Sequence, residues 1–204
     1  QEVCNRRGWE LIKQPIDWNT KDMELNSGSI DCIWNGFTMT GREDSYTFSE
    51  PYVDNSIVFV VLADSDIQTA ADLAGKVVVT QADSSALSAL ESEDNAELTA
   101  SFATLEQIAD YNSAFMNLEA GVDDAIAVDI GVAQYQLQSR GDKFRMLEEP
   151  LSTEQYAIGF KQGNTELRDQ VQETLDEMLA DGTFDEIVAN YTDYNLDQMV
   201  CLGK

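Results

Sequence analysis

Short apolar runs alternate with helical patterns along this chain of 204 residues. Four such runs occupy residues 30–34, 57–62, 76–80 and 125–128. Buried strands separated by helices are typical of α/β folds, in which ligands gather at the carboxyl ends of the strands. The length is sufficient for one large core or for two modest ones. The sequence therefore predicts an α/β protein of one or two lobes.

Further elements are predicted from the spacing of apolar residues and from residues that typically begin or end helices. Residues 1–8 are typical of the end of a helix that stops at a glycine, and residues 9–16 alternate as in a strand. A TxxD cap is expected at residues 69–72, a strand at 97–102, and an amphipathic helix from residue 167 that stops at 181–182. Residues 183–186 are interpreted as the capping box of the next helix, and residues 195–204 as a surface tail.

Composition excludes several classes of function. The chain has 38 acidic and 12 basic residues, a net charge of −26, so neither nucleic acid nor an anionic membrane surface is expected as a partner. Histidine is absent, which excludes Ser-His-Asp and Cys-His catalytic machinery and the commonest zinc sites. Neither a metal nor a cofactor is expected. No apolar run reaches the length of a membrane span.

The cysteines carry no short metal-binding or redox spacing. Cys4, Cys32 and Cys201 are an odd number, so at least one thiol is unpaired within a monomer. A bridge between Cys4 and Cys32 and three free thiols are both compatible with the sequence. The disulfide state is therefore left open here.

Arg42 is the strongest candidate for a ligand contact. It follows Trp34-Asn35-Gly36-Phe37-Thr38-Met39-Thr40-Gly41, in an acid-rich stretch of the chain. A guanidinium binds both oxygens of a carboxylate at once, and small residues before it allow backbone donors to approach the same group. The alternative is a surface arginine paired with a neighbouring acidic residue. We expect Arg42 to bind the carboxylate of an amino acid.

Two other segments carry candidate polar groups. Ser84 and Ser85 stand between a strand and the start of a helix, where free N–H groups favour an anion. The alternative for either serine is a helix cap. Asp129 ends an apolar run and faces the same alternative, as the cap of the helix that follows it.

In their order and spacing, several blocks of the sequence resemble the solute-binding proteins of polar amino-acid ABC importers, family 3, of the glutamine-binding and lysine/arginine/ornithine-binding kind. The blocks are residues 25–31, Gly36 to Thr40 with Arg42, residues 48–52, 79–86, 127–129 and 156–182. The chain departs from the family in two places. One residue, not two, separates Thr40 from Arg42, and the family's leading strand is missing before residue 1.

The resemblance implies a fold and a division into lobes. The fold is a two-lobed α/β clamshell of the type II periplasmic-binding-protein class, with two hinge crossovers near residues 52–56 and 152–156. Lobe 1 is discontinuous, comprising residues 1–54 and 155–204 and incomplete at its N-terminus. Lobe 2 comprises residues 55–154. Hinge closure would bring contacts from both lobes onto one ligand.

The resemblance also implies roles for individual residues. The Thr40 backbone and the Ser84 and Ser85 group would help Arg42 to bind the ligand carboxylate. Asp129 would receive the ligand ammonium, together with the Gly36 carbonyl and the Thr38 hydroxyl. Side-chain selectivity would rest on three further residues, Trp34, Phe37 and Gln81. The alternatives are a core position for Trp34 and a solvated loop position for Gln81.

The function implied is non-catalytic binding of a polar amino acid and its delivery to the membrane subunits of an ABC importer. The location implied is extracytoplasmic, with a signal peptide removed and with a lipid anchor upstream compatible with it. Two alternatives use the same fold. One is an enzyme similar to cyclohexadienyl dehydratases, and the other is the ligand-binding ectodomain of a receptor or sensor kinase.

Overall fold

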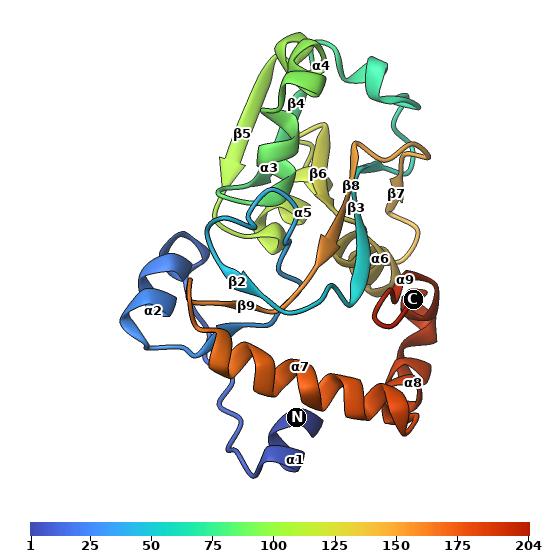
Figure 1. Ribbon diagram of the computed structural model, residues 1–204. Coiled ribbons are helices and arrows are strands. Elements are labelled where there is room, and N and C mark those ends of the chain that lie inside the picture. The colour runs from blue at the N-terminus through green and yellow to red at the C-terminus, as the bar shows by residue number, and fades with distance from the viewer. The chain divides into compact units, whose positions relative to one another are not determined.

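The computed structural model describes residues 1–192 and 194–204. The chain divides into two units. Unit 1 comprises Gln1–Asp54 and Glu154–Lys204, and unit 2 comprises Asn55–Thr153. Unit 1 is therefore built from both ends of the chain, which Figure 1 shows in blue and in red.

Unit 2 is built on a six-stranded mixed sheet. Its path runs β5-β4-β6-β3-β7, and β8 also pairs with β3. The strands are β3 (Val53–Leu62), β4 (Val77–Gln81), β5 (Thr104–Ile108), β6 (Ala125–Asp129), β7 (Phe144–Met146) and β8 (Ser152–Tyr156). β4 is parallel to β5 and β6, whereas β3 is antiparallel to β6 and β7. The chain crosses between the units within β3 and within β8.

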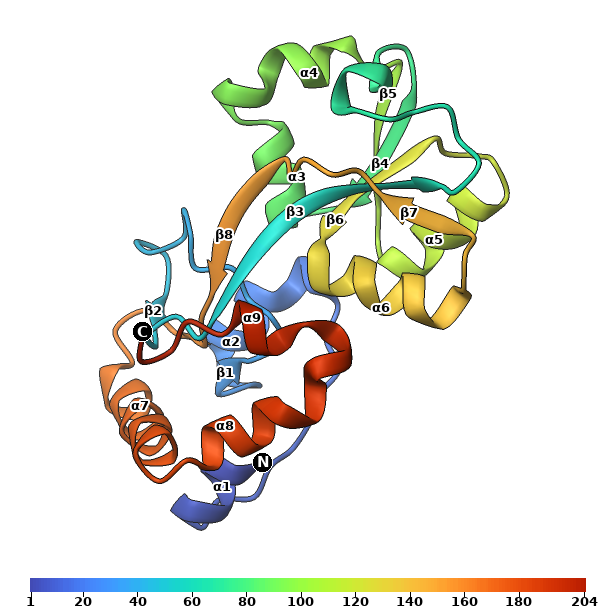
Figure 2. The ribbon, with the colours of Figure 1, turned by 90° about the vertical axis from the view of Figure 1, so that its right-hand side faces the viewer.

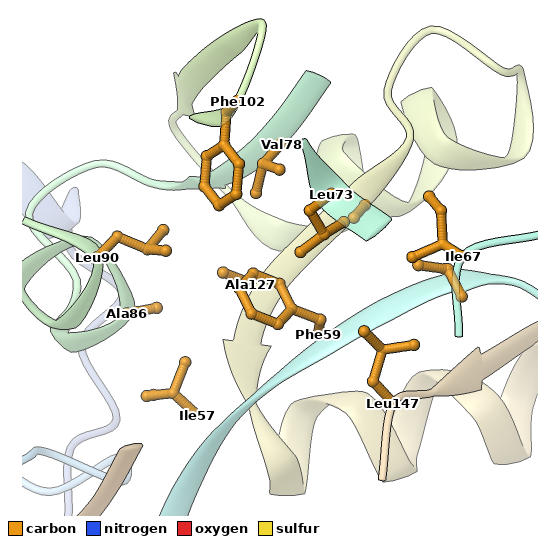
Figure 3. Close-up of a cluster of buried hydrophobic side chains, with 12 residues drawn as sticks. Ile57, Phe59, Ile67, Leu73, Val78, Ala86, Leu90, Phe102, Ala127 and Leu147 are labelled. Carbon is orange, nitrogen blue, oxygen red and sulfur yellow. The ribbon is translucent and has the colours of Figure 1, made fainter. Parts of the chain in front are cut away.

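Helices cover both faces of this sheet. On β3, Ile57, Phe59 and Val61 are buried in one apolar cluster, while Val58 and Val60 are buried in another. Because side chains alternate along a strand, the two clusters lie on opposite faces. The first (Figure 3) includes residues of η2 (Ala70–Leu73), α3 (Ser85–Leu90) and α4 (Ala96–Ser101), where α4 follows η3 (Glu93–Asn95). The second includes residues of α5 (Tyr111–Glu119) and α6 (Ile130–Arg140). Both helices lie beside the sheet in Figure 2.

Unit 1 has a smaller antiparallel sheet. Its order is β1-β9-β2, and each strand is two residues long: β1 (Cys32–Ile33), β2 (Thr47–Phe48) and β9 (Gly159–Phe160). One apolar cluster joins α7 to the sheet and to Val3 of α1, and an aromatic cluster around Phe37 includes Tyr46 and Phe48. The helices are α1 (Glu2–Arg7), η1 (Trp18–Thr20), α2 (Lys21–Ser27), α7 (Thr165–Ala180), α8 (Thr183–Val188), η4 (Ala189–Tyr194) and α9 (Leu196–Met199).

Two arginines attach α1 to the helices near the other end of the chain. Arg6 donates to Asp181 at 2.8 Å and to Thr183 at 2.9 Å. Arg7 donates to Glu173 at 2.7 Å and contacts Thr174. These contacts join residues that are more than 160 positions apart in the sequence. The beginning and the end of the chain therefore form one unit.

Several predicted local structures are present. The capping box is formed at Thr69 and Asp72, where the Asp72 carboxylate accepts the Thr69 N–H at 2.9 Å. α1 ends at Gly8, whose φ of 69° lies in the left-handed region. α7 buries Val171, Leu175 and Met178 on one face, in agreement with the helical spacing.

Two predicted strands are absent from the structure. Residues 9–16 form no strand, because none of the described strands pairs with this segment, and the Ile12 side chain is 73% exposed. The prediction of a strand at 97–102 is wrong, since α4 covers most of that segment. Leu98 and Phe102 both pack on the first cluster of unit 2. Their separation of four residues fits one face of a helix.

The predictions for the last part of the chain also need correction. α8 has Gly182 at its N-cap and no side-chain cap, and the Thr183 N–H instead donates to Asp181 at 3.0 Å. The segment interpreted as a surface tail is packed. Val200 faces Val53 in a β-bridge, and Leu202 is 3% exposed within the α7 cluster. Burial of these apolar side chains explains why the segment is ordered against unit 1.

Candidate functional site

The candidate residues of unit 1 lie on a loop that runs beside residues 154–157. Thr38 faces Tyr156 in an antiparallel bridge, Met39 N–H donates to Gln155 at 2.8 Å, and Ala157 N–H donates to Phe37 at 3.0 Å. These backbone bonds hold residues 37–39 of the loop against residues 155–157. The predicted residues Gly36, Thr38, Thr40 and Arg42 are called the unit 1 site group below.

Gly36 begins this loop in a conformation that favours glycine. Its φ is 83°, and a Cβ atom at this position would lie 3.0 Å from the Tyr156 ring. Both the backbone conformation and the close ring therefore disfavour any larger residue. The loop approaches Tyr156 closely for this reason.

Arg42 is held over an aromatic ring. Its Cζ atom lies 5.1 Å from the centroid of the Phe37 ring, which is fully buried in contact with other aromatic residues. A cation over a ring face is stabilised by the ring quadrupole. The Arg42 N–H donates to Met39 at 2.9 Å, so the backbone turns at this point. The guanidinium is half-buried at the end of the loop.

Two hydroxyl groups of the loop form hydrogen bonds with the neighbouring segment, one as an acceptor and the other as a donor. The Thr40 hydroxyl accepts the Gln155 N–H at 3.1 Å. The Thr38 hydroxyl donates to the buried Glu154 carboxylate, with 2.7 Å between the two oxygens. Glu154 is a polar residue of this loop environment that sequence reasoning missed. It lies 116 residues from Thr38 in the chain, and no local pattern marks it.

Trp34 and Tyr52 meet near Gly36. Trp34 is 42% exposed, so the alternative of a core position does not hold for it. Burial raises the pKa of Tyr52 to about 12, while hydrogen bonds from the Gly36 backbone and the Trp34 side chain act in the opposite direction. Tyr52 was also missed from the sequence. Tyr52 packs on the apolar cluster of α7, whereas Trp34 is exposed.

The first candidate residues of unit 2 lie between β4 and α3. Ser84 is the N-cap of α3: its Oγ accepts the Leu87 N–H at 3.1 Å and donates to the Gln81 carbonyl at 2.7 Å. The alternative of a helix cap therefore holds for Ser84, and it remains compatible with a ligand contact. Ser85 is the first residue of α3, and Gln81 donates to the Ala109 carbonyl at 2.9 Å.

Asp83 stands at the tightest point of this turn. Its φ is 56°, one of two positive values among the non-glycine residues described. Aspartate tolerates the left-handed region better than most residues, since its short polar side chain can hydrogen-bond locally. The turn therefore places a carboxylate beside Ser84 and Ser85.

Asp129 lies at the carboxyl end of β6 and precedes α6. It occupies the N-cap position without making a side-chain cap, so that alternative is excluded. Its Oδ1 atom accepts the Asn55 amide at 2.9 Å. Asn55 is 3% exposed and was not a sequence candidate. Gln81, Ser84, Ser85 and Asp129 are called the unit 2 site group below.

Tyr111 links the two parts of the unit 2 site group. Its hydroxyl lies 3.4 Å from Thr80 Oγ1, which in turn lies 3.4 Å from Ser84 Oγ. Burial and the nearby Asp129 carboxylate raise the pKa of Tyr111 above its ordinary range. The hydroxyl therefore stays protonated at neutral pH. A tyrosine at the start of α5 gives no signal that would have marked it in the sequence.

The family of the chain follows from a comparison with known proteins. Residues 1–194 match the model of the bacterial extracellular solute-binding proteins, family 3. The chain belongs to this family. The L-cystine-binding protein TcyA of Bacillus subtilis (strain 168) is 30% identical to this family 3 chain over 188 residues, covering 91% of the chain and 67% of TcyA. The glutamate-binding protein GluB of Corynebacterium efficiens is 26% identical over 194 residues, covering 89% and 64%.

Solved structures show the same fold. An ABC uptake transporter substrate-binding protein from Streptococcus pneumoniae with bound histidine has a TM-score of 0.87 and 33% identity, over 93% of this chain and 78% of that one. Tv2483 bound to L-arginine has a TM-score of 0.87 and 30% identity, over 96% and 79%. The fold is therefore that of the type II amino-acid-binding proteins. The family 3 chain spans about two thirds of the length of the curated relatives above.

The described residues contain no cluster of three or more acidic or thiol side chains that would suit a metal ion. Within the same part of the chain, none of the helices has the length and apolar character that crossing a membrane requires. The three cysteines are free thiols in the structure, and burial is the main cause that raises the pKa of Cys32 to about 11.

Proposed function

We propose that this family 3 protein binds a polar amino acid, with Arg42 of the unit 1 site group and Asp129 of the unit 2 site group contacting opposite ends of the same ligand. Arg42 binds the α-carboxylate, assisted by the Thr40 N–H and by the Ser84 and Ser85 segment. Asp129 binds the α-ammonium, together with the Gly36 carbonyl and the Thr38 hydroxyl. Trp34, Phe37 and Gln81 contact the ligand side chain.

The observation that carries the proposal is the opposite charge of two side chains, Arg42 in the unit 1 site group and Asp129 in the unit 2 site group. Arg42, which lies over Phe37, supplies a cation, and Asp129, which does not cap its own helix, supplies an anion. A zwitterion presents one charge of each sign and loses hydration when it is bound. It therefore needs a partner at each end. Closure of the units on a ligand that contacts both groups would be favoured by contacts that exist only in the closed state.

The class of ligand is supported by the relatives. The proteins with similar sequences include L-cystine-, glutamate-, glutamine- and arginine-binding proteins. The similar structures include complexes with arginine, histidine and glutamine. All of these ligands share the α-amino and α-carboxylate groups and differ in their side chains. This common part is what the two site groups are proposed to bind.

The bound amino acid would be passed to the membrane subunits of an ABC importer. The names of two similar proteins include an ABC transporter: the glutamine-binding protein GlnH of Bacillus subtilis (strain 168) and the substrate-binding protein from Streptococcus pneumoniae. The family description places its members outside the cytoplasm. We therefore propose that this protein works in the periplasm or on the outer face of the cell membrane.

A thermal-shift screen against the twenty amino acids tests the proposal. A ligand at a hundredfold excess over its Kd stabilises the native state by about 2.7 kcal/mol, so a polar amino acid should raise the Tm clearly. The corresponding amine and carboxylic acid, each lacking one charged group, serve as matched controls and should give smaller shifts. Absence of a shift with all twenty amino acids would contradict the proposal.

Binding without turnover separates this function from catalysis on the same fold. Prephenate and arogenate, the substrates of cyclohexadienyl dehydratases, should remain unchanged on incubation with the protein, as followed by absorbance and chromatography. Conversion of either one would replace the proposed function by an enzymatic one. A receptor ectodomain would bind the same ligand and show no stimulation of import in reconstituted vesicles.

A further inference from the structure

Thr38 and Glu154 form a buried polar pair in unit 1. Their exposed fractions are 4% and 8%, and 2.7 Å separates Thr38 Oγ1 from Glu154 Oε1. A threonine hydroxyl has one hydrogen and two lone pairs, whereas an ionised carboxylate only accepts. The hydroxyl hydrogen therefore points to Glu154. A bond to a charged acceptor is also stronger than a neutral one, so this orientation is favoured.

The backbone holds the two residues in register. Thr38 is bridged to Tyr156, and the bonds from Met39 to Gln155 and from Ala157 to Phe37 lie on either side of that bridge. Glu154 is in β8, which crosses into unit 1 at this residue. The pair therefore depends on main-chain pairing, and Glu154 is held at a fixed position relative to the loop of the unit 1 site group.

This arrangement decides whether the Thr38 hydroxyl acts as a donor or as an acceptor toward a further group. With its hydrogen committed to Glu154, the oxygen can only accept a further hydrogen bond. An ammonium group offers three donors, and a carboxylate offers none. We propose that Glu154 is a positioning residue that makes Thr38 an acceptor and thereby selective for the ammonium end of the ligand. This inference rests on the proposed function.

The measured quantity is the discrimination ratio, which is the Kd of the des-amino analogue divided by the Kd of the amino acid identified in the screen. Glu154→Leu removes the acceptor and keeps an apolar side chain of similar volume. The Thr38 hydroxyl can then rotate and donate. We expect the ratio to fall by roughly 2- to 10-fold, the range that one hydrogen bond supplies. Glu154→Gln keeps an acceptor oxygen and should retain most of the ratio.

A double-mutant cycle with Thr38→Val separates this role from a structural one. If Glu154 acts through the Thr38 hydroxyl, Glu154→Leu should leave the ratio of the Thr38→Val protein unchanged. A general loss of stability would instead weaken both ligands by the same factor. Thr153→Ala, an exposed change on the same strand, is the matched control and should have no effect on the ratio.

Three results would overturn the inference. They are an unchanged ratio in Glu154→Leu, an equal fall of the ratio in the Thr38→Val background, and failure of Glu154→Gln to restore it. If Glu154→Leu does not fold, the comparison of Glu154→Gln with Thr38→Val decides: the first should keep the ratio and the second should lose it. A wild-type protein that binds no amino acid would reject the proposed function itself, a different outcome from all of these.

Discussion

The two units are stabilised in different ways. Unit 2 has a six-stranded sheet in which strand β3 is ten residues long and buries apolar side chains on both faces. Unit 1 has three strands of two residues each, and its helix α1 is attached through Arg6 and Arg7. Apolar burial contributes about 25 cal/mol per Å², whereas exposed ion pairs contribute little. We therefore expect unit 1 to unfold at a lower temperature than unit 2.

The units also differ in the charge that they offer a ligand. Unit 1 presents the Arg42 guanidinium on a loop fixed by main-chain bonds to residues 154–157. Unit 2 presents the Asp129 carboxylate at the end of a buried strand. Each charge is thus on a different unit. A ligand that binds both should couple the unfolding of the two units.

The largest expected effect comes from removing a fully buried ring from each unit. Phe59→Ala in unit 2 and Phe37→Ala in unit 1 should each cost about 3–5 kcal/mol. All three tryptophans, Trp9, Trp18 and Trp34, lie in unit 1, so their fluorescence follows that unit. We expect Phe37→Ala to lower the fluorescence transition and Phe59→Ala to lower the later transition seen by circular dichroism. One shared transition in both variants would remove the proposed difference in stability.

Alanine substitutions at two glycines should change the free energy of unfolding by smaller amounts and in opposite directions. A Cβ atom at Gly159 in unit 1 would lie 2.6 Å from the Phe37 ring, so Gly159→Ala should destabilise by about 1–3 kcal/mol. Gly131 lies within α6 of unit 2 with open space around it, so Gly131→Ala should stabilise by about 0.5–1 kcal/mol. Urea unfolding of both variants measures the two changes. If Gly159→Ala also stabilised the protein, the packing around Phe37 would have to adjust to the added methyl group.

The smallest expected effect concerns the exposed contact that holds α1. The hydrogen bond from Arg6 is the main cause that lowers the pKa of Asp181 below its ordinary 3.8, followed by bonds from Thr183. A lowered pKa stabilises the folded state above pH 3.8 and stops doing so as the pH falls through the folded value. Arg6→Ala should therefore lower the Tm of unit 1 slightly at pH 7, and the difference from wild type should shrink on acidification below pH 3.8.

Lys143→Ala is the matched control for this contact. Lys143 forms an exposed ion pair with Glu119 in unit 2. Its removal should leave the tryptophan transition of unit 1 unchanged at every pH. A difference for Arg6→Ala that stays constant down to pH 2 would show that the charge of Asp181 does not contribute to holding α1.

The sequence predicted unit 2 better than unit 1. In unit 2 the buried runs at 57–62, 76–80 and 125–128 correspond to β3, β4 and β6, because a strand buried on both faces is a continuous apolar run. The segment at 97–102 was misassigned because Leu98 and Phe102 fit either a strand or a helix. In unit 1 the segment at 9–16 has a strand pattern, but none of the strands in the described residues pairs with it. Pairing between distant segments cannot be deduced from a local pattern.

The residues of the candidate site likewise divide into those that a local pattern marks and those that only the fold brings together. Arg42 and Asp129 could be proposed from the sequence because a cation among acidic residues, and an acid at the end of a strand, are local features. Glu154, Tyr111 and Asn55 were missed because each of them reaches its partner only through the fold. The Glu154 contact with Thr38 spans 116 residues, and the Asn55 contact with Asp129 spans 74.

The central claim is that Arg42 and Asp129 bind opposite ends of one amino acid. Calorimetric titration of wild type, Arg42→Ala and Asp129→Asn with the amino acid, its des-amino acid and its decarboxylated amine tests it most directly. Arg42→Ala should weaken binding of the amino acid by about 2–5 kcal/mol and leave the amine nearly unaffected. Asp129→Asn should weaken the amino acid and leave the des-amino acid nearly unaffected. Equal losses for all three ligands in either variant would contradict the claim.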